Sequence, residues 1–168
     1  LPNHRLSLRT GEVKRYWGGE PDPDGSTEER LSRVATRISG SIRSASQRYP
    51  LAVGLSAGWD SRLILASCRD IRNEIRAYST APRSQAGTAV DVKLPERICR
   101  ENHIRHDVLV PSESPSAAFR SAFGEHVFRP HPEFTAYMES ELNYSRGEIA
   151  GVTGNIAEIV KNPYAGKT

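Results

Sequence analysis

Short apolar segments alternate with helical segments along most of this chain, and this alternation limits the fold more than any other feature. Residues 51–55 form a continuous apolar run of the kind found in strands that are buried on both faces. Strands are also predicted at 74–80, 105–110 and 148–153. Strands that alternate with helices at this spacing predict βαβ crossovers, and therefore an α/β fold with a parallel sheet.

The helical segments carry start and stop signals. They are expected at 26–48, at 62–68, at 88–101 and within 114–145. The first begins with a capping box, in which Ser26 accepts from the amide of Glu29 while the Glu29 carboxylate reaches back. Pro95 conflicts with the third segment, so we expect it to kink that helix or to mark its true start.

The first 25 residues are rich in turn formers and contain one short strand-like run at 12–17. This composition predicts a connecting segment with at most a hairpin.

Charge is spread evenly through the sequence. Its 168 residues include 23 Lys and Arg against 20 Asp and Glu, which gives a formal net charge of +3. The basic residues, mostly arginines, are scattered among acids instead of forming a stripe. Because nucleic-acid binders concentrate positive charge on one face, the sequence argues against a nucleic-acid partner.

Membrane insertion and secretion have no support in the sequence. No apolar stretch approaches the roughly 18 residues of a membrane span, and the first twenty residues lack the apolar core of a signal peptide. The two cysteines, Cys68 and Cys99, do not have the spacing of a zinc site or a disulfide framework. We therefore expect no membrane partner and a location in the reducing cytoplasm.

The loop from Ser56 to Ser61, between the first apolar strand and a helix, is the strongest candidate for a site. Its small residues, Ala57 and Gly58, let backbone amides converge on an anion beside the positive end of the following helix. An acid among phosphate-binding groups, here Asp60, needs a divalent cation between itself and the phosphates. The alternative is an ordinary turn with Asp60 as a helix N-cap, which contributes about 1 kcal/mol. From the residues alone, both interpretations stay open.

The loop resembles the Ser-Gly-Gly-x-Asp-Ser pyrophosphate loop of the N-type ATP pyrophosphatases, with Ala57 in place of the first glycine. The resemblance narrows toward the asparagine synthetase branch of that family. Residues 1–17 are similar to the linker that follows the glutaminase domain of those enzymes. Asp91 lies in a segment that resembles the acidic helix after the adenine-binding strand. Residues 152–158 are similar to the second phosphate loop, Ser-Gly-Glu-Gly-Ala-Asp-Glu.

The resemblance implies a three-layer α/β/α fold of the HUP type. It also implies that 1–25 is the linker from a preceding glutaminase-type domain and that 26–168 is the N-terminal portion of an ATP pyrophosphatase synthetase domain. The implied activity is that of an ATP-dependent carbon–nitrogen ligase that forms AMP and pyrophosphate. A substrate carboxylate would attack the α-phosphate to give an acyl-adenylate, which glutamine-derived ammonia or an amine would open to an amide. The implied partners are the small-molecule carboxylate, the nitrogen donor and the glutaminase-type domain. The resemblance is also compatible with a homodimer.

The same resemblance implies a set of site residues. The positions expected to contact the nucleotide are Leu55, Ser56, Ala57, Gly58, Asp60, Ser61, Ser79, Thr80, Thr153 and Gly154. Adenine would lie against the backbone near Leu55 and near Ser79 and Thr80. Asp60 and Glu158 would hold Mg²⁺, with Glu158 in place of the Asp of the family. No residue of this span is assigned as catalytic.

Departures in the second loop keep two alternatives open. Asn155 and Ile156 replace the Glu and the second Gly of the family. One alternative is another ATP pyrophosphatase that transfers to a different acceptor. The other is a module that binds ATP or AMP with little catalysis.

Three further features do not indicate a functional site. Residues 166–168 read Gly-Lys-Thr, but Lys161 occupies the position where a Walker A loop needs glycine. His103 and His106 have a metal-like spacing without a third ligand nearby, which favours surface or capping roles. Cys68 is expected to be a buried small hydrophobe.

Overall fold

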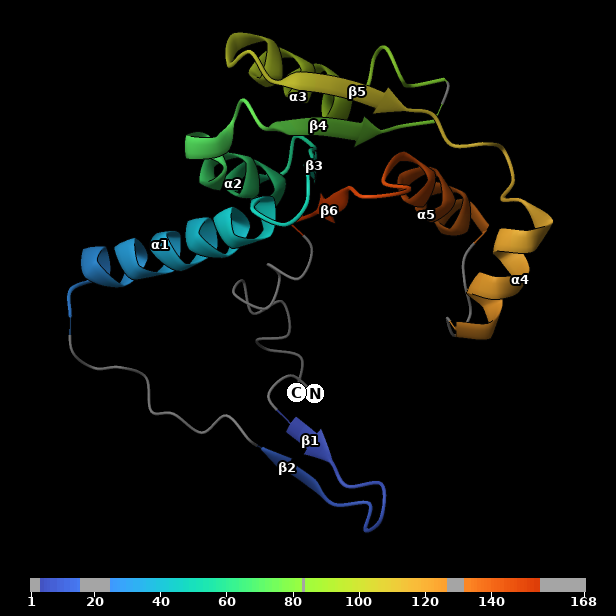
Figure 1. Cartoon of the computed structure of the whole chain (residues 1–168). Coiled ribbons are helices and arrows are strands. Elements are labelled where there is room, and N and C mark those ends of the chain that lie inside the picture. The colour runs from blue at the N-terminus through green and yellow to red at the C-terminus, as the bar shows by residue number, and fades with distance from the viewer. Residues whose placement is uncertain (1–3, 16–24, 83, 127–131, 155–168) are drawn as a thin grey trace. The chain divides into compact units, whose positions relative to one another are not determined.

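A four-stranded, all-parallel sheet organises the larger part of the chain. The computed structural model describes residues 4–15, 25–82, 84–126 and 132–154. The strands of the sheet are β3 (Leu51–Gly54), β4 (Ile75–Thr80), β5 (Arg105–Leu109) and β6 (Ala150–Val152). Each strand falls within a segment expected from the sequence, so the predicted α/β class and parallel sheet are confirmed (Figure 1).

The strand order, β5-β4-β3-β6, creates a switch in direction between β3 and β6. Leu51 of β3 pairs with Ile75 of β4 on one side and with Ala150 of β6 on the other. The chain therefore moves outward from β3 through β4 to β5 and then returns to the far side of β3. In open α/β sheets, ligands bind at the carboxyl ends of the strands beside such a switch point.

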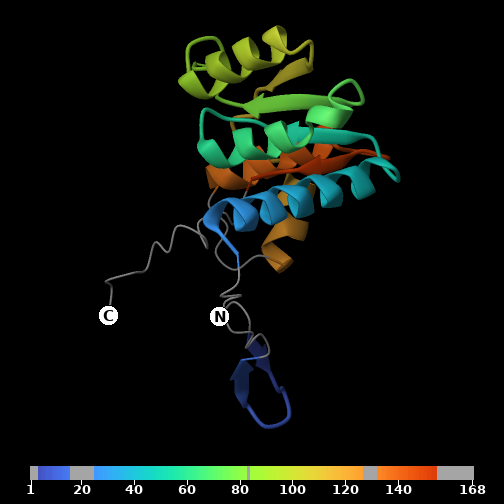
Figure 2. The same ribbon diagram turned by 90° about the vertical axis from the view of Figure 1, so that its left-hand side faces the viewer.

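Helices cover both faces of the sheet, which gives α/β/α layers (Figures 1 and 2). The described helices are α1 (Thr27–Ser46), α2 (Trp59–Ser67), the short 3-10 helix η1 (Arg69–Ile71), α3 (Val90–Glu101), α4 (Ala117–His126) and α5 (Pro132–Tyr144). Of these, α4 packs against α5, where the rings of Phe123 and Phe134 lie 6.5 Å apart. Ile42 of α1, Leu65 of α2 and Cys99 of α3 belong to one core with Leu51 and Val53 of β3. The other face of the sheet packs against α5.

The alternation along β4 explains how one strand serves both layers. Ile75 and Ala77 lie in the core beneath α1, α2 and α3. Arg76, Tyr78 and Thr80, on the opposite face, contact α5, and the rings of Tyr78 and Tyr144 are 5.1 Å apart. Because successive side chains of a strand point to opposite faces, the sequence pattern of β4 separates these two environments.

Both cysteines are fully buried and free of disulfide bonding. Burial raises the pKa of each thiol, Cys68 and Cys99, to about 11. The thiolate is therefore suppressed at neutral pH, and the interpretation of Cys68 as a buried small hydrophobe is confirmed.

The chain divides into two units, one up to Thr36 and one from Arg37. In the first unit, β1 (His4–Leu6) and β2 (Val13–Arg15) form an antiparallel hairpin. The capping box before α1 is also confirmed. Ser26 Oγ accepts from the amide of Glu29 at 3.2 Å, and the Glu29 carboxylate accepts from the amide of Ser26 at 2.6 Å.

Helix boundaries differ from the sequence expectations in three places. α2 begins at Trp59, three residues before the predicted start, and the predicted helical stretch from 114 to 145 contains two helices, α4 and α5. α3 begins at Val90 and continues through Pro95, so the expectation that this proline could mark the helix start is wrong. The Pro95 ring is fully buried, and its apolar contacts offset the hydrogen bond that proline cannot donate.

None of the described helices combines the length and the apolarity that crossing a membrane requires.

Candidate functional site

The loop after β3 is fastened by its two serines. The Ser61 hydroxyl accepts from the amide of Ser56 at 3.0 Å and lies 3.0 Å from the Ser56 hydroxyl. The same hydroxyl is 3.2 Å from the carbonyl oxygens of Ser56 and Gly58. The short polar residues expected to donate to a ligand therefore also hold the loop in shape.

Two further amides of this loop donate within the protein. The Ala57 N–H donates to Asp91 Oδ1 at 2.8 Å, and the Gly58 N–H donates to Ser56 Oγ at 3.2 Å. Ala57 does not have the positive φ that glycine would favour, so its replacement of the family's glycine needs no strained backbone here. The bond to Asp91 instead ties the loop to the first turn of α3.

Asp60 lies in the first turn of α2, where the helix dipole favours negative charge. The N-cap of this helix is Gly58, and no side chain makes a cap hydrogen bond there. The alternative interpretation of Asp60 as the helix N-cap is therefore wrong. Asp60 lines a cavity at this end of the sheet.

The loop after β6 lies directly against the first turn of α2. A Cβ built on Gly154 would lie 2.7 Å from the carbonyl carbon of Asp60 and 2.7 Å from the amide nitrogen of Ser61. Only glycine allows this approach without a shift of the backbone. The contact joins the two segments that the sequence analysis singled out, although they are almost 100 residues apart in the chain.

These segments line an open cavity of about 400 Å³ at the switch point between β3 and β6. Its lining consists of Gly54, Leu55, Ser56, Gly58, Asp60, Ser61, Tyr78, Thr80, Asp91, Tyr137, Glu141, Thr153 and Gly154. All the predicted nucleotide-binding residues that the structure describes belong to this lining except Ala57 and Ser79. Glu158, predicted as a metal ligand, lies outside the described residues.

Ser79 occupies the interior of the sheet. Its hydroxyl donates to the Leu55 carbonyl at 2.7 Å and lies 2.9 Å from His106 Nε2. Burial lowers the pKa of His106, which favours the neutral ring. His106 therefore links β5 to β4, in place of the surface or capping role expected from the sequence. His103 is exposed and takes the left-handed conformation after α3, with a φ of 57°, which agrees with a capping role.

The cavity wall opposite α2 comes from α5 and was not assigned to the site from the sequence. Tyr137 and Glu141 of α5 line it, beside Tyr78 and Thr80 of β4. Thr80 Oγ1 donates to Glu141 Oε1 at 3.3 Å. Burial raises the pKa of Glu141, against the smaller opposing effect of this hydrogen bond. No local signal in the sequence marks these residues, because only the packing of α5 on the sheet brings them to β4.

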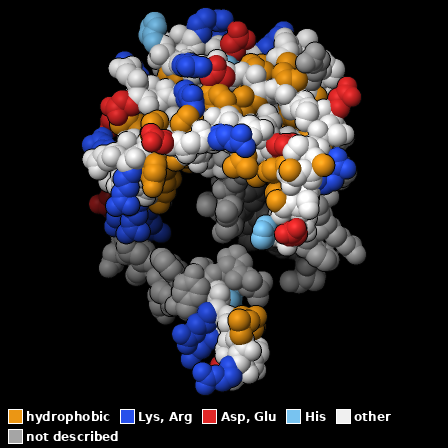
Figure 3. Space-filling model, turned by 45° about the vertical axis from the view of Figure 1, so that its right-hand side comes forward, with side chains coloured by type: hydrophobic (Ala, Val, Ile, Leu, Met, Phe, Trp, Pro, Cys, Tyr) orange, Lys and Arg blue, Asp and Glu red, His pale blue; other side chains and the backbone are white. Residues whose placement is uncertain are grey.

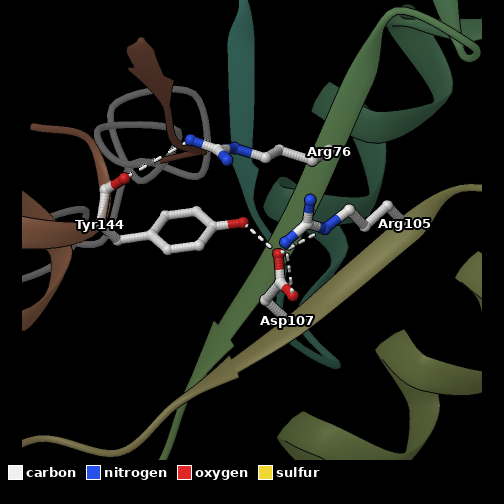
Figure 4. Close-up of polar contacts among 4 residues, drawn as sticks. All are labelled: Arg76, Arg105, Asp107 and Tyr144. Atoms are coloured by element: carbon white, nitrogen blue, oxygen red, sulfur yellow. Dashed lines mark hydrogen bonds and ion pairs between the residues drawn. The ribbon is translucent and has the colours of Figure 1, made fainter. Parts of the chain in front are cut away.

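A polar cluster at the end of α5 holds this wall against the sheet (Figure 4). The Tyr144 hydroxyl donates to Asp107 Oδ2 at 2.6 Å, and Arg105 Nε donates to the same oxygen at 3.1 Å. Arg76 stacks on the Tyr144 ring, with its guanidinium carbon 4.6 Å from the ring centre. Burial alone would raise the pKa of Asp107, but the bonds from Tyr144 and Arg105 hold it below its ordinary value.

Acidic side chains dominate the charge of the cavity. Asp60, Asp91 and Glu141 line it, and neither lysine nor arginine is among its described lining residues. The described residues contain no group of three or more His, Cys, Asp or Glu side chains that could hold a metal ion by themselves. Mg²⁺ in phosphate sites is commonly held by one or two carboxylates together with the phosphates, and Asp60 fits that role.

The surface of the larger unit carries mixed charge on the face shown in Figure 3, where basic side chains are interspersed with acidic, polar and hydrophobic ones. This distribution agrees with the scattered arginines of the sequence.

Comparison of the sequence with models of known protein families gives no match, and comparison with curated proteins gives no significant match.

Proposed function

We propose that this chain is the nucleotide-binding part of an ATP-dependent amide ligase of the asparagine synthetase type, built on a HUP-type fold. The reaction would form AMP and pyrophosphate while it activates a substrate carboxylate as an acyl-adenylate. Ammonia from glutamine, or an amine, would then form the amide. The proposal includes a glutaminase-type partner domain and a cytoplasmic location.

The observation that carries this proposal is the cavity at the β3–β6 switch point. The loop that resembles the pyrophosphate loop and the segment that resembles the second phosphate loop both line it, and they touch at Gly154. The resemblance of the two segments to phosphate loops does not by itself imply that they touch. The volume of about 400 Å³ also suits a small-molecule ligand.

In this proposal, the first turn of α2 receives the β- and γ-phosphates of ATP. The amides and dipole of a helix N-terminus favour anions, and Ser56 and Ser61 add hydroxyl groups beside them. Leu55 and Thr80 would border the adenosine end of the cavity. Asp91 would keep the loop in register with α3 through the amide of Ala57.

Asp60 would hold Mg²⁺ together with the phosphates. Bound there, Mg²⁺ supplies electrostatic stabilisation of the charge that builds up on pyrophosphate as it departs. Three carboxylates without a lysine or arginine in the described lining would otherwise repel a triphosphate, so the charge of the cavity supports a requirement for a divalent cation.

ATP–pyrophosphate exchange tests the proposal directly. We expect the full-length protein to exchange label between pyrophosphate and ATP when the correct amino-acid carboxylate is present in a panel, and Asp60→Ala to abolish the exchange. Asp60→Ala should also weaken Mg·ATP binding by more than the roughly 10- to 100-fold that loss of an outer-sphere metal partner costs. The predicted effect of Glu158→Gln on Mg·ATP binding is much smaller.

Asp70→Ala is the matched control. Asp70 lies in η1, is exposed and pairs with Arg43 at 2.7 Å, away from the cavity. It should leave nucleotide binding unchanged. The absence of Mg·ATP binding by folded wild-type protein would contradict the proposal.

A non-catalytic ATP- or AMP-binding module is the second candidate, favoured by Asn155 and Ile156 in the second loop. It predicts Mg·ATP binding without exchange for any carboxylate. The third candidate is another ATP pyrophosphatase. If the chain is one, ATP–pyrophosphate exchange should depend on an acceptor other than an amino acid.

A further inference from the structure

Glu141 is a half-buried acid in the wall of the cavity, and the proposed chemistry does not use it. It comes from α5, and Thr80 Oγ1 donates to its Oε1 at 3.3 Å. Its charge is close enough to Tyr78 to contribute, after burial, to raising the pKa of that phenol to about 12. Among the described lining residues, no lysine or arginine faces it.

A carboxylate in this position has unused capacity to accept hydrogen bonds. An ionised carboxylate offers about four acceptor sites, and the hydroxyl of Thr80 supplies one donor. Burial of a charge is costly unless other groups compensate for it. The wall of the cavity is therefore suited to a ligand that presents hydrogen-bond donors to α5.

The position of Glu141 in the cavity indicates which part of a nucleotide these donors belong to. The residues predicted to bind phosphate lie in the first turn of α2 and just before it; they are Ser56, Gly58, Asp60 and Ser61. Glu141 lies beside Thr80 on the α5 side of the sheet. A nucleotide with its phosphates at α2 extends its nucleoside toward Thr80. A pair of adjacent ribose hydroxyls supplies two donors, and carboxylates bind ribose hydroxyls in other parallel α/β sheets.

We infer that Glu141 accepts hydrogen bonds from the ribose hydroxyls of the bound nucleotide and thereby selects ribonucleotides over deoxyribonucleotides. This inference rests on the proposed function, because it requires ATP in the cavity. The carboxylate also disfavours nucleotides with a phosphate on the 2′ or 3′ oxygen, since like charges would meet there.

Calorimetric binding of four nucleotides by the full chain tests the inference. The ligands are the Mg²⁺ complexes of ATP, 2′-deoxy-ATP, 3′-deoxy-ATP and ITP, with wild type, Glu141→Gln and Glu139→Gln. Wild type should bind ATP about 10- to 100-fold more tightly than at least one deoxynucleotide, as expected for hydrogen bonds to a charged group. It should bind ITP about as tightly as ATP.

The two variants separate recognition from general damage. Glu141→Gln should reduce the preference for ATP over the deoxynucleotides to within about threefold. Glu139→Gln changes the same residue type on the same helix, where the carboxylate instead bonds Ser116, and should keep the full preference.

The possible failures are distinguishable. Equal binding of ATP and both deoxynucleotides by wild type overturns this inference and leaves the proposed function intact. Weak binding of ITP with tight binding of both deoxynucleotides also overturns it, because the adenine amino group would then be the group recognised. Failure of every nucleotide to bind contradicts the proposed function itself. The comparison among ligands in wild type holds even if a variant does not fold.

Discussion

Gly154 shows how one missing side chain positions two loops. A Cβ at this residue would lie 2.7 Å from backbone atoms of Asp60 and Ser61, whereas a Cβ at Gly151 in β6 would meet only the Ser145 hydroxyl, at 3.6 Å. The first distance requires a backbone shift, and the second is an ordinary contact. The identity of residue 154 thus decides whether the loop after β6 can reach the start of α2.

We expect Gly154→Ala to destabilise the fold by about 1–3 kcal/mol, as overpacking usually does, and to weaken Mg·ATP binding at least tenfold, since the loop can no longer approach α2. Chemical denaturation and calorimetry measure the two effects. Gly151→Ala should change nucleotide binding by less than about twofold. Unchanged nucleotide binding by Gly154→Ala would mean that the close approach is not needed for the site.

Glu141 makes the stability of the ligand-free protein depend on pH. Its pKa in the folded state is raised by burial, so the folded state binds more protons than the unfolded state between the ordinary and the raised value. Its contribution to stability is full below the ordinary glutamate pKa and is lost as the pH rises through the folded value. We expect Glu141→Gln to raise Tm at about pH 7 and to leave it nearly unchanged at about pH 4.

Glu139 makes stability depend on pH in the opposite direction. Its hydrogen bonds from Ser116 lower its pKa, so its contribution is present above the ordinary pKa and is lost as the pH falls. Glu139→Gln should lower Tm at about pH 7. Thermal melts of both variants across this range measure the contrast, and shifts of the same sign would refute the assignment.

At the scale of elements, the cluster in Figure 4 holds α5 on the sheet and so positions the wall that contains Tyr137 and Glu141. The bond from Tyr144 to Asp107 is short, at 2.6 Å, and joins α5 to β5. The stacking of Arg76 on the Tyr144 ring joins α5 to β4. α5 is thus attached to two strands at one point.

Tyr144→Phe removes the hydroxyl and keeps the ring contacts. We expect a loss of about 1 kcal/mol at pH 7, below the usual range for hydrogen bonds to charges because Asp107 is partly exposed. The pKa of Asp107 is held below its ordinary value, so the loss should shrink as the pH falls through that lowered value. Urea denaturation at several pH values measures it. A double-mutant cycle with Asp107→Asn should give a coupling energy, and strict additivity would contradict the bond.

Elements with strong local signals were predictable from the sequence. The capping box fixed the start of α1, and the apolar run of β3 and the alternation of β4 located two central strands. The start of α3 was not predictable from Pro95, because the local cost of a proline in a helix is offset here by contacts of its fully buried ring. Only the folded protein supplies those contacts. The early start of α2 was missed because Gly58, its N-cap, carries no side chain that could signal a cap.

At the scale of the molecule, the βαβ pattern predicted a parallel sheet but not its strand order. The loop of residues 56–61 could be located because its residues are consecutive. The α5 wall could not, since Glu141 meets Thr80 across 61 positions of sequence. Asp91 could be predicted only in part. The sequence indicates that its segment belongs near the site, but its hydrogen bond to the amide of Ala57 depends on how α3 packs.

The acidic cavity predicts a dependence on metal. Without a divalent cation, a triphosphate meets Asp60, Asp91 and Glu141 with no lysine or arginine among the described lining residues. We expect EDTA to weaken ATP binding by about tenfold or more and Mg²⁺ to restore it. Calorimetry with and without the chelator measures this, at constant ionic strength as the control. Equal affinity in both conditions would exclude a metal-bridged triphosphate.

The lining of the cavity extends along the chain from Gly54 to Gly154 and draws on β3, α2, β4, α3, α5 and the loop after β6. A ligand can therefore occupy it only after nearly the whole sheet has paired, and it has no binding site on a half-formed chain. A ligand that binds only the folded state stabilises that state by mass action. At 100 times its Kd, it adds about 2.7 kcal/mol to the free energy of unfolding. In a cell, the concentration of such a ligand would set the fraction of chains exposed to proteases as well as the fraction able to bind.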